Sequence, residues 1–114
     1  MTPSFIAVTK DFAVSPQLQA QDMAHVASQG YKTVINNRPD EEGGATQPRS
    51  ADLAQAAQAA GLQYAYLPVV GGAITAEQAQ AMGELLCTMP GPVLAFCRSG
   101  ARSAQLFSLA QAAR

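Results

Sequence analysis

The segment from Val93 to Ala113 constrains the fold of this chain more than any other part of its sequence. Four apolar residues, Val93 to Phe96, end at Cys97, and a turn with one glycine and two arginines leads to a helical pattern that begins at Ala101. A short apolar run bounded by turn residues is typical of a buried strand. The cysteine is therefore expected between the carboxyl end of a strand and the first turn of a helix.

This position has chemical consequences for the Cys97 thiol. Backbone N–H groups and the helix dipole favour negative charge at the start of a helix. We expect them to lower the thiol pKa and to make Cys97 a thiolate nucleophile. The same N–H groups would cradle an oxyanion, and Arg102 is placed to fork onto two of its oxygens. The loop therefore predicts covalent catalysis on a substrate with a small tetrahedral anion.

Strands and helices alternate along most of the chain. Strands are expected at 5–8, 12–14, 33–36, 62–70 and 93–96, and helices at about 18–27, 51–60, 75–87 and 101–113. This alternation predicts an α/β fold with a mostly parallel central sheet and helices on its faces. Ligands of such sheets bind beyond the carboxyl ends of the strands. Cys97 and the long polar loop from Asn37 to Ser50 both lie at such ends.

Composition narrows the choice of partners. The 114 residues are expected to form one domain, 1–114, and the content of 48% hydrophobic and 13% charged residues supports a packed core. The net charge of −1 gives no basic field for nucleic acid or an acidic membrane surface. An apolar run of the roughly 20 residues that span a bilayer is absent from the sequence. Neither nucleic acid nor membrane is therefore expected as a partner.

The cysteine and histidine content indicates compartment and cofactors. Cys87 and Cys97 are too few for a disulfide framework, and a thiol nucleophile is better kept in a reducing compartment. Since the N-terminus also lacks the pattern of a signal peptide, a cytoplasmic location is expected. His25 is the only histidine, so neither a metal site nor another cofactor is predicted. Cys87, beside two leucines late in its helix, is expected to pack in the core.

Several segments together resemble one family. They are TVINNRPD at 33–40, QP at 47–48, AGL at 60–62, PV at 68–69, GAIT at 72–75 and GPVLAFCRSGARS at 91–103. Their order and spacing resemble the phosphatase-like domain of beta-lactamase-hydrolase-like proteins over nearly the whole chain. The resemblance implies a three-layer sandwich similar to the dual-specificity cysteine phosphatases. Some family members are fused to a persulfide dioxygenase, and members are described both as phosphatases and as sulfurtransferases.

The residues of the loop favour a sulfurtransferase. Four residues separate Cys97 from Arg102, which resembles many rhodaneses, whereas cysteine phosphatases have one residue more. Phe96 stands where phosphatases usually carry histidine, and the stretch 67–74 lacks the carboxylate that protonates the leaving group in dual-specificity phosphatases. Transfer of sulfur from thiosulfate expels sulfite, which is stable without protonation. The residues of the loop therefore favour sulfur transfer over phosphoryl transfer.

In this hypothesis, Cys97 takes the outer sulfur of thiosulfate or a persulfide and passes it to a thiol acceptor such as glutathione. Arg102 grips the anionic end of the donor, and other residues bind the substrate. Arg98 would steer anions, Ser99, Gly100 and Ala101 would donate backbone N–H groups, Ser103 would donate its hydroxyl, and Asn37 and Arg38 would line the entrance.

Two alternatives stay open. One is a cysteine-dependent phosphatase that forms a Cys97 phosphoenzyme, with Asp40, Glu41 or Glu42 swinging in from the long loop as the acid. The other is a catalytically weak anion-binding domain that docks onto a persulfide dioxygenase partner. Gly43-Gly44 and Gly71-Gly72 are expected to serve turns in either case.

Overall fold

A five-stranded sheet forms the centre of the molecule in the computed structural model, which describes residues 4–112. In spatial order, the strands are β1 (Ile6–Thr9), β2 (Phe12–Ser15), β5 (Val93–Phe96), β3 (Thr33–Asn36) and β4 (Gln63–Tyr66). β1 pairs with β2 in antiparallel fashion, and the three other pairs are parallel. The predicted α/β fold with a mostly parallel sheet is confirmed.

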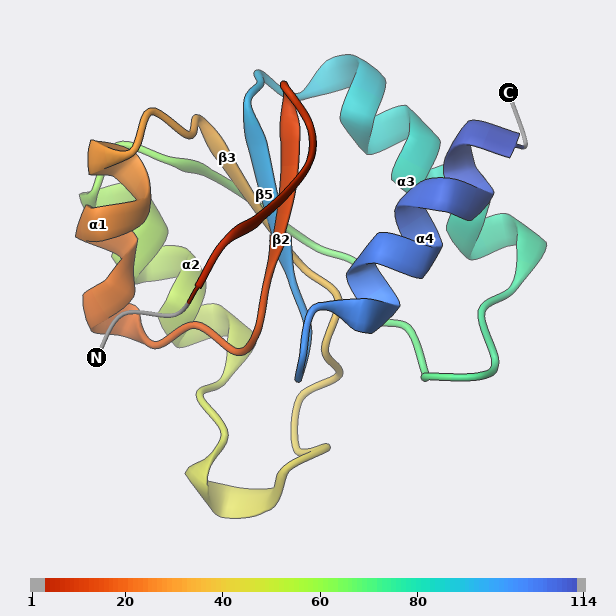
Figure 1. The fold of residues 1–114 in the computed structure, drawn as a ribbon. Helices are drawn as coiled ribbons and strands as arrows, with labels where there is room; N and C mark the ends of the chain where they lie inside the picture. The colour runs from red at the N-terminus through yellow and green to blue at the C-terminus, as the bar shows by residue number, and fades with distance from the viewer. Residues whose placement is uncertain (1–3, 113–114) are drawn as a thin grey trace.

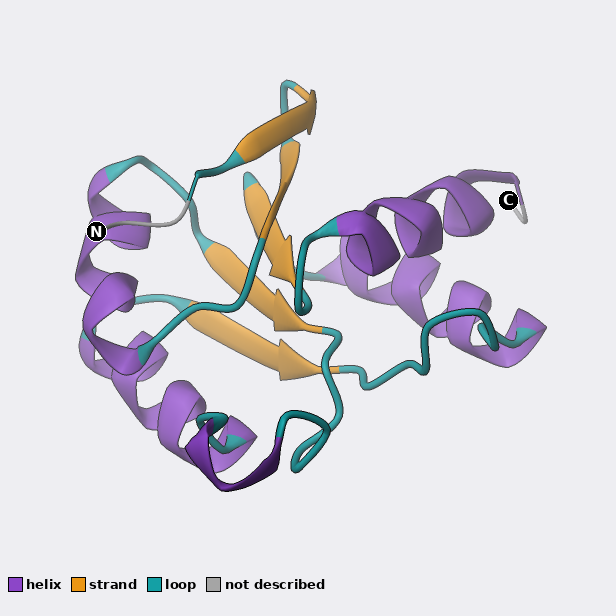
Figure 2. Cartoon of the chain, turned by 60° about the horizontal axis from the view of Figure 1, so that its bottom comes forward, coloured by secondary structure: helices purple, strands orange, loops and turns teal. Residues whose placement is uncertain are grey.

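Helices cover both faces of this sheet and complete a three-layer sandwich (Figure 1). One layer contains α1 (Met23–Ser28) and α2 (Ser50–Ala59), and the other contains α3 (Ala76–Thr88) and α4 (Ala101–Ala112). Figure 2 shows the sheet between these two helical layers. Two short 3-10 helices, η1 (Ala20–Asp22) and η2 (Gly44–Thr46), lie in the connections.

Alternation of side chains along β5 divides the core in two. Leu94 and Phe96 pack in the cluster beneath α1 and α2, whereas Val93 and Ala95 pack in the cluster beneath α3 and α4. All four residues are buried because helices cover both faces of the strand, which explains why β5 has a continuous apolar sequence. The core thus fixes the end of β5, the point from which the Cys97 loop departs.

The structure refines some of the predicted boundaries. The strand expected over 62–70 ends at Tyr66, since Pro68 has no N–H group for a sheet ladder. The predicted capping box of α3 is present, because Gln78 donates its N–H to Thr75 Oγ1 at 3.1 Å and accepts the Thr75 N–H at 2.9 Å. The expectation that Cys87 is a core residue was wrong, because this thiol is exposed.

Helix length also bears on membrane insertion. The helices found within residues 4–112 are all too short or too polar to cross a bilayer.

Candidate active site

The carboxyl ends of three parallel strands meet at one edge of the sheet. Asn36 at the end of β3 lies opposite both Phe96 of β5 and Tyr66 of β4. Pairing continues one residue further, because Asn37 donates its N–H to the Phe96 carbonyl at 2.9 Å. The long loop from Asn37 to Ser50 leaves from the same end of the sheet at which β5 leads into α4 (Figure 1). The predicted site residues are therefore brought to one edge.

The Cys97 sulfur lies inside a loop of N–H donors. Gly100 donates its backbone N–H to Cys97 Sγ at 3.0 Å, and Cys97 itself is only 1% exposed. Gly100 has a φ of +96°, a left-handed conformation that glycine adopts without steric cost. A side chain there would also contact the Ser15 backbone, with an ideal Cβ 3.4 Å from its carbonyl oxygen. Glycine thus lets the loop curl tightly around the sulfur.

This cradle changes the acidity of the thiol. Burial raises the pKa of Cys97, but hydrogen bonds from the backbone N–H groups of Ser103, Gly100 and Ser99 outweigh burial. The net result is a pKa below the ordinary thiol value, which is the direction of shift expected from the sequence. The predicted N–H group of Ala101 is used differently, since it donates to Ser99 Oγ at 3.3 Å.

Asn37 supports the loop from beneath. Its side chain is fully buried, donates from Nδ2 to the Leu67 carbonyl at 2.9 Å, and accepts the Ser103 hydroxyl on Oδ1 at 2.8 Å. The expectation that Asn37 lines the entrance is not met, because both ends of its amide are bound inside the protein. The Ser103 hydroxyl also lies beside the Cys97 thiol. It donates its hydrogen bond to Asn37 Oδ1, however, because an amide oxygen can only accept.

A charged hollow of about 620 Å³ opens beside the loop. Its lining combines three arginines, one carboxylate and a small apolar rim: Arg38, Arg98, Arg102, Glu42, Gly43, Val70 and Gly71. Arg38 from the 37–50 loop thus converges with Arg98 of the Cys97 loop and Arg102 of the first turn of α4, and all three are predicted site residues.

Glu42 is the charged partner of two of these arginines. Arg102 grips both of its oxygens, with Nη1 2.8 Å from Oε2 and Nη2 3.1 Å from Oε1. Arg38 Nε donates to Glu42 Oε1 at 3.0 Å. The Arg102 hydrogen bonds hold the pKa of Glu42 below its usual range, against the opposing effect of partial burial. Glu42 is therefore ionised at neutral pH in this arrangement.

Two glycines give the arginines room. An ideal Cβ on Gly71 would lie 3.3 Å from Arg102 Nε, and one on Gly43 would lie 2.6 Å from Arg38 Nη2. The sequence interpretation assigned these glycine pairs only to turns. That role fits Gly44 and Gly72, whose φ angles are positive. It does not account for Gly43 and Gly71, which pack against the arginine side chains. Polar sequence surrounds Gly43-Gly44 and was a signal for the site, whereas Gly71-Gly72 stands between apolar residues and gave no such signal.

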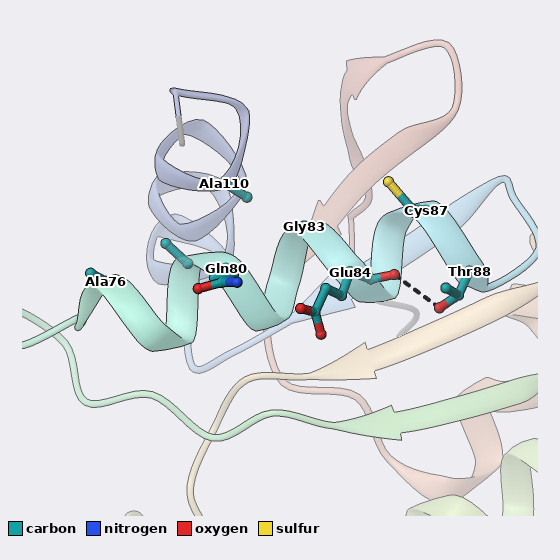
Figure 3. A pocket seen from close by; sticks show the side chains of 8 residues that line it. Ala76, Gln80, Gly83, Glu84, Cys87, Thr88 and Ala110 are labelled. Carbon is teal, nitrogen blue, oxygen red and sulfur yellow. Dashed lines mark hydrogen bonds between the residues drawn. The ribbon is translucent and has the colours of Figure 1, made fainter. Parts of the chain in front are cut away.

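A second hollow, of about 480 Å³, lies between α3 and α4 (Figure 3). Its wall is made largely of small residues such as Ala76, Gly83 and Ala110, with Cys87 at one end. Glu84 is the charged residue in this lining, so the groove does not attract anions. The two hollows have different lining residues, and the three arginines line the one beside the Cys97 loop.

Metal ions have no evident site in the part of the chain that the structure describes. Among residues 4–112, the side chains of His, Cys, Asp and Glu do not gather in groups of three or more that would hold a metal ion.

Fold and loop together define a cysteine-phosphatase-like domain. The chain belongs to the family of the beta-lactamase hydrolase-like protein, phosphatase-like domain, whose family model matches residues 4–114. The resemblance inferred from the sequence is thereby confirmed. Beta-lactamase hydrolase-like proteins of Xylella fastidiosa and Agrobacterium fabrum are 35% and 34% identical to the chain over 93% and 94% of its length. The chain spans about a quarter of the length of these relatives, 24% and 25% respectively.

Solved phosphatase structures share the fold. A candidate phosphatase from Neisseria meningitidis superposes with a TM-score of 0.80 at 30% identity, covering 95% of this chain and 87% of that one. The core catalytic domain of a PP-IP phosphatase from S. cerevisiae gives a TM-score of 0.72 at 16% identity, covering 93% and 64% of the two chains. The second likeness concerns the fold alone.

These comparisons overturn the sulfurtransferase hypothesis. The matching family and the similar solved structures are phosphatase-like, so the assignment of Cys97 as a persulfide carrier for thiosulfate or a persulfide was wrong. The physical error lay in reading the reaction from local sequence features alone, namely the loop length, Phe96 and the missing carboxylate in 67–74. The shorter spacing between Cys97 and Arg102 still allows Gly100 to reach the sulfur and Arg102 to face the charged hollow.

Proposed function

We propose that this domain is a cysteine-dependent phosphatase that hydrolyses phosphate monoesters through a phosphoenzyme on Cys97. The observation that carries the proposal is the Cys97 thiol held by loop N–H donors, next to a hollow that contains three arginines. Similarity to the Neisseria candidate phosphatase supports the same reaction class. An ionised sulfur beside guanidinium groups is suited to attack a phosphoryl group whose charge those groups neutralise.

The reaction runs in two displacements. The Cys97 thiolate attacks phosphorus, a P–S bond forms, the P–O ester bond breaks, and the leaving oxygen takes a proton from solvent. Water then attacks the phosphocysteine, the P–S bond breaks with its electrons returning to sulfur, and inorganic phosphate departs after water has lost a proton to solvent. Loop N–H groups and Arg102 bind the phosphoryl oxygens in both steps.

Leaving-group chemistry follows from the residues near the hollow. The stretch 67–74 contains no carboxylate, and Glu42 is ionised by its contacts with Arg102. An ionised carboxylate does not donate a proton, so substrates with stable leaving anions, such as aryl phosphates, are the expected ones.

The direct test is hydrolysis of p-nitrophenyl phosphate. Wild-type protein and Cys87→Ser are expected to release nitrophenol, whereas Cys97→Ser and Arg102→Ala are expected to be inactive. Cys87→Ser is the matched control because it removes the other thiol, which is exposed and belongs to the groove between α3 and α4.

Intact-mass analysis identifies the intermediate. Acid quenching of Cys87→Ser during turnover is expected to trap one phosphoryl group, whereas the variant that also carries Cys97→Ser is expected to trap none. Nitrophenol release that persists in Cys97→Ser would overturn the proposal, as would the absence of turnover in the wild-type protein.

A further inference from the structure

The carboxylate of Glu42 occupies the face of Arg102 that an oxyanion needs. Its two oxygens take one N–H from each terminal nitrogen of the guanidinium, at 2.8 and 3.1 Å. Arg102 uses Nη1 once more, toward the Val69 carbonyl at 3.1 Å. A fork of two parallel N–H bonds fits two oxygens of a carboxylate and two oxygens of a phosphoryl group equally well. Glu42 and an incoming anion therefore compete for the same donors.

Glu42 is held in this position by its own loop. Gln47 ties the loop together, because its Oε1 accepts the Gly43 N–H at 2.6 Å and its Nε2 donates to the Pro39 carbonyl at 2.8 Å. On the other side of Glu42, Asp40 binds the Ser50 N–H through Oδ1 at 2.8 Å. The loop therefore presents the carboxylate to Arg102 in a defined place.

The loop also offers Glu42 a second cation. Arg38 lies four residues earlier and donates from Nε to Glu42 Oε1 at 3.0 Å. When another anion takes Arg102, Glu42 can keep this Arg38 contact, because both residues belong to the same loop. Displacement from Arg102 therefore leaves the carboxylate paired.

The net charge of the hollow determines which anions can displace Glu42 from Arg102. Three arginines and one carboxylate leave a surplus of two positive charges. A monoanion offers Arg102 the same charge that Glu42 already supplies, and so gains little by replacing it. A dianion brings a second charge into that surplus and an additional oxygen for the N–H groups of the loop.

Building on the proposed phosphatase function, we propose that Glu42 is a specificity-determining residue: it is the resident ligand of Arg102, and the site selects dianionic phosphoryl groups because only they displace it. Monoanionic carboxylates and sulfate esters are excluded by competition with Glu42. Arg102 then turns to the phosphoryl oxygens while Glu42 stays on Arg38.

Phenyl phosphate and phenyl sulfate form a suitable pair of probes. They share shape and aryl group, but the phosphate is a dianion above its second pKa of about 6, whereas the sulfate is a monoanion. Dissociation constants of both are measured by titration calorimetry in protein carrying Cys97→Ser, so that binding is recorded without turnover. The same measurement is made after adding Glu42→Gln.

Glu41→Gln is the matched control. It removes the same charge one residue away, from an exposed side chain outside the lining of the hollow. Glu42→Gln is expected to lower the dissociation constant of phenyl sulfate by about tenfold or more, because the glutamine no longer competes as an anion for Arg102. The ratio of the two dissociation constants, which favours phenyl phosphate, is expected to become smaller. Glu41→Gln is expected to leave the ratio of the two constants unchanged.

Three results would overturn the inference: an unchanged ratio in Glu42→Gln, an equal change in Glu41→Gln, or weaker binding of both probes, which would make Glu42 a support for Arg102. Failure of the wild-type protein to hydrolyse p-nitrophenyl phosphate would defeat the proposed function alone. Because the binding ratios are measured without turnover, the two failures are distinguishable.

Discussion

Ser103 donates its hydroxyl hydrogen bond to Asn37 Oδ1 at 2.8 Å across a separation of 66 residues. This contact joins the end of β3 to the first turn of α4, and both residues are fully buried. The backbone N–H of Ser103 is one of the donors that lower the pKa of Cys97. Asn37 is thus a positioning residue, which reaches the nucleophile through Ser103.

Replacement of Asn37 tests this relationship. Asn37→Ala leaves the Ser103 hydroxyl and the Leu67 carbonyl without their buried partner, and a loss of about 1–3 kcal/mol in unfolding free energy is expected. Because Ser103 is no longer anchored, the pKa of Cys97 is expected to rise. Denaturant unfolding measures the first effect, and a titration of thiolate ultraviolet absorbance in a Cys87→Ser background measures the second.

Asn36→Ala provides the control. Asn36 is also buried and hydrogen-bonded, to the Tyr64 hydroxyl at 3.1 Å and the Arg38 N–H at 2.8 Å, but it does not contact Ser103 through its described hydrogen bonds. This variant is expected to be destabilised without a change in the Cys97 titration. Equal titration shifts in both variants would show that general loosening, and not the Asn37–Ser103 bond, sets the thiol pKa.

The pKa of Cys97 also predicts how stability varies with pH. Folding lowers the pKa of this thiol from its ordinary value of 9.0, so the folded state holds the proton less tightly than the unfolded chain does. The resulting stabilisation is complete above the unfolded pKa and is lost as pH falls through the folded pKa. Between these limits, the unfolding free energy is expected to gain up to about 1.4 kcal/mol per pH unit.

Urea unfolding across this pH range checks the prediction. The quantity to follow is the difference in unfolding free energy between Cys87→Ser and the double variant that also carries Cys97→Ser. This difference should increase with pH in favour of the protein that retains Cys97. A difference that is flat or decreases with pH would mean that the cradle does not favour the thiolate.

Local sequence patterns explain why much of the fold was predictable. β5 is a run of four apolar residues because both of its faces are covered, and the capping box of α3 lies within four consecutive residues. The position of Cys97 between strand and helix followed in the same way. In each case, neighbours in sequence determine the structure.

The site was less predictable because its key contacts join distant segments. Arg102 and Glu42 are separated by 60 residues, and their contact depends on the conformation of the whole 37–50 loop. The close approach of Gly71 to Arg102 has the same origin. The reaction itself was mistaken because loop length, Phe96 and the missing carboxylate were weighed without the geometry of the donors. That geometry depends on the positive φ of Gly100, where a Cβ would lie 3.4 Å from the Ser15 backbone.

Arg98 and Arg102 are expected to have separate effects on kinetics. Arg98 is exposed, so Arg98→Ala is expected to raise KM for p-nitrophenyl phosphate severalfold at low salt, to leave kcat unchanged, and to lose its effect as salt screens the charge. Arg102→Lys loses the fork and is expected to lower kcat by about 100-fold. Lys10→Ala, which removes an exposed charge near the β1–β2 turn, is the control. Salt-independent loss of kcat in Arg98→Ala would contradict this division.

Gly71 tests whether the position of Arg102 matters as well as its presence. An alanine Cβ at Gly71 would lie 3.3 Å from Arg102 Nε, so the guanidinium must shift by a few tenths of an ångström. Because small misplacements of a binding group are costly in the transition state, Gly71→Ala is expected to lower kcat by about tenfold with little change in unfolding free energy. Steady-state kinetics and denaturant unfolding measure the two quantities.

Gly83→Ala in α3 is the matched substitution. There the added Cβ would lie 4.0 Å from Ala110 Cβ, an ordinary contact in the groove between α3 and α4 (Figure 3). Alanine in place of glycine within a helix is expected to raise the unfolding free energy by up to about 1 kcal/mol and to leave kcat unchanged. Full kcat in Gly71→Ala, as expected for Gly83→Ala, would contradict the prediction. The tight packing of Gly71 against Arg102 would then have no catalytic consequence, and Glu42 and Val69 alone would set the position of the guanidinium.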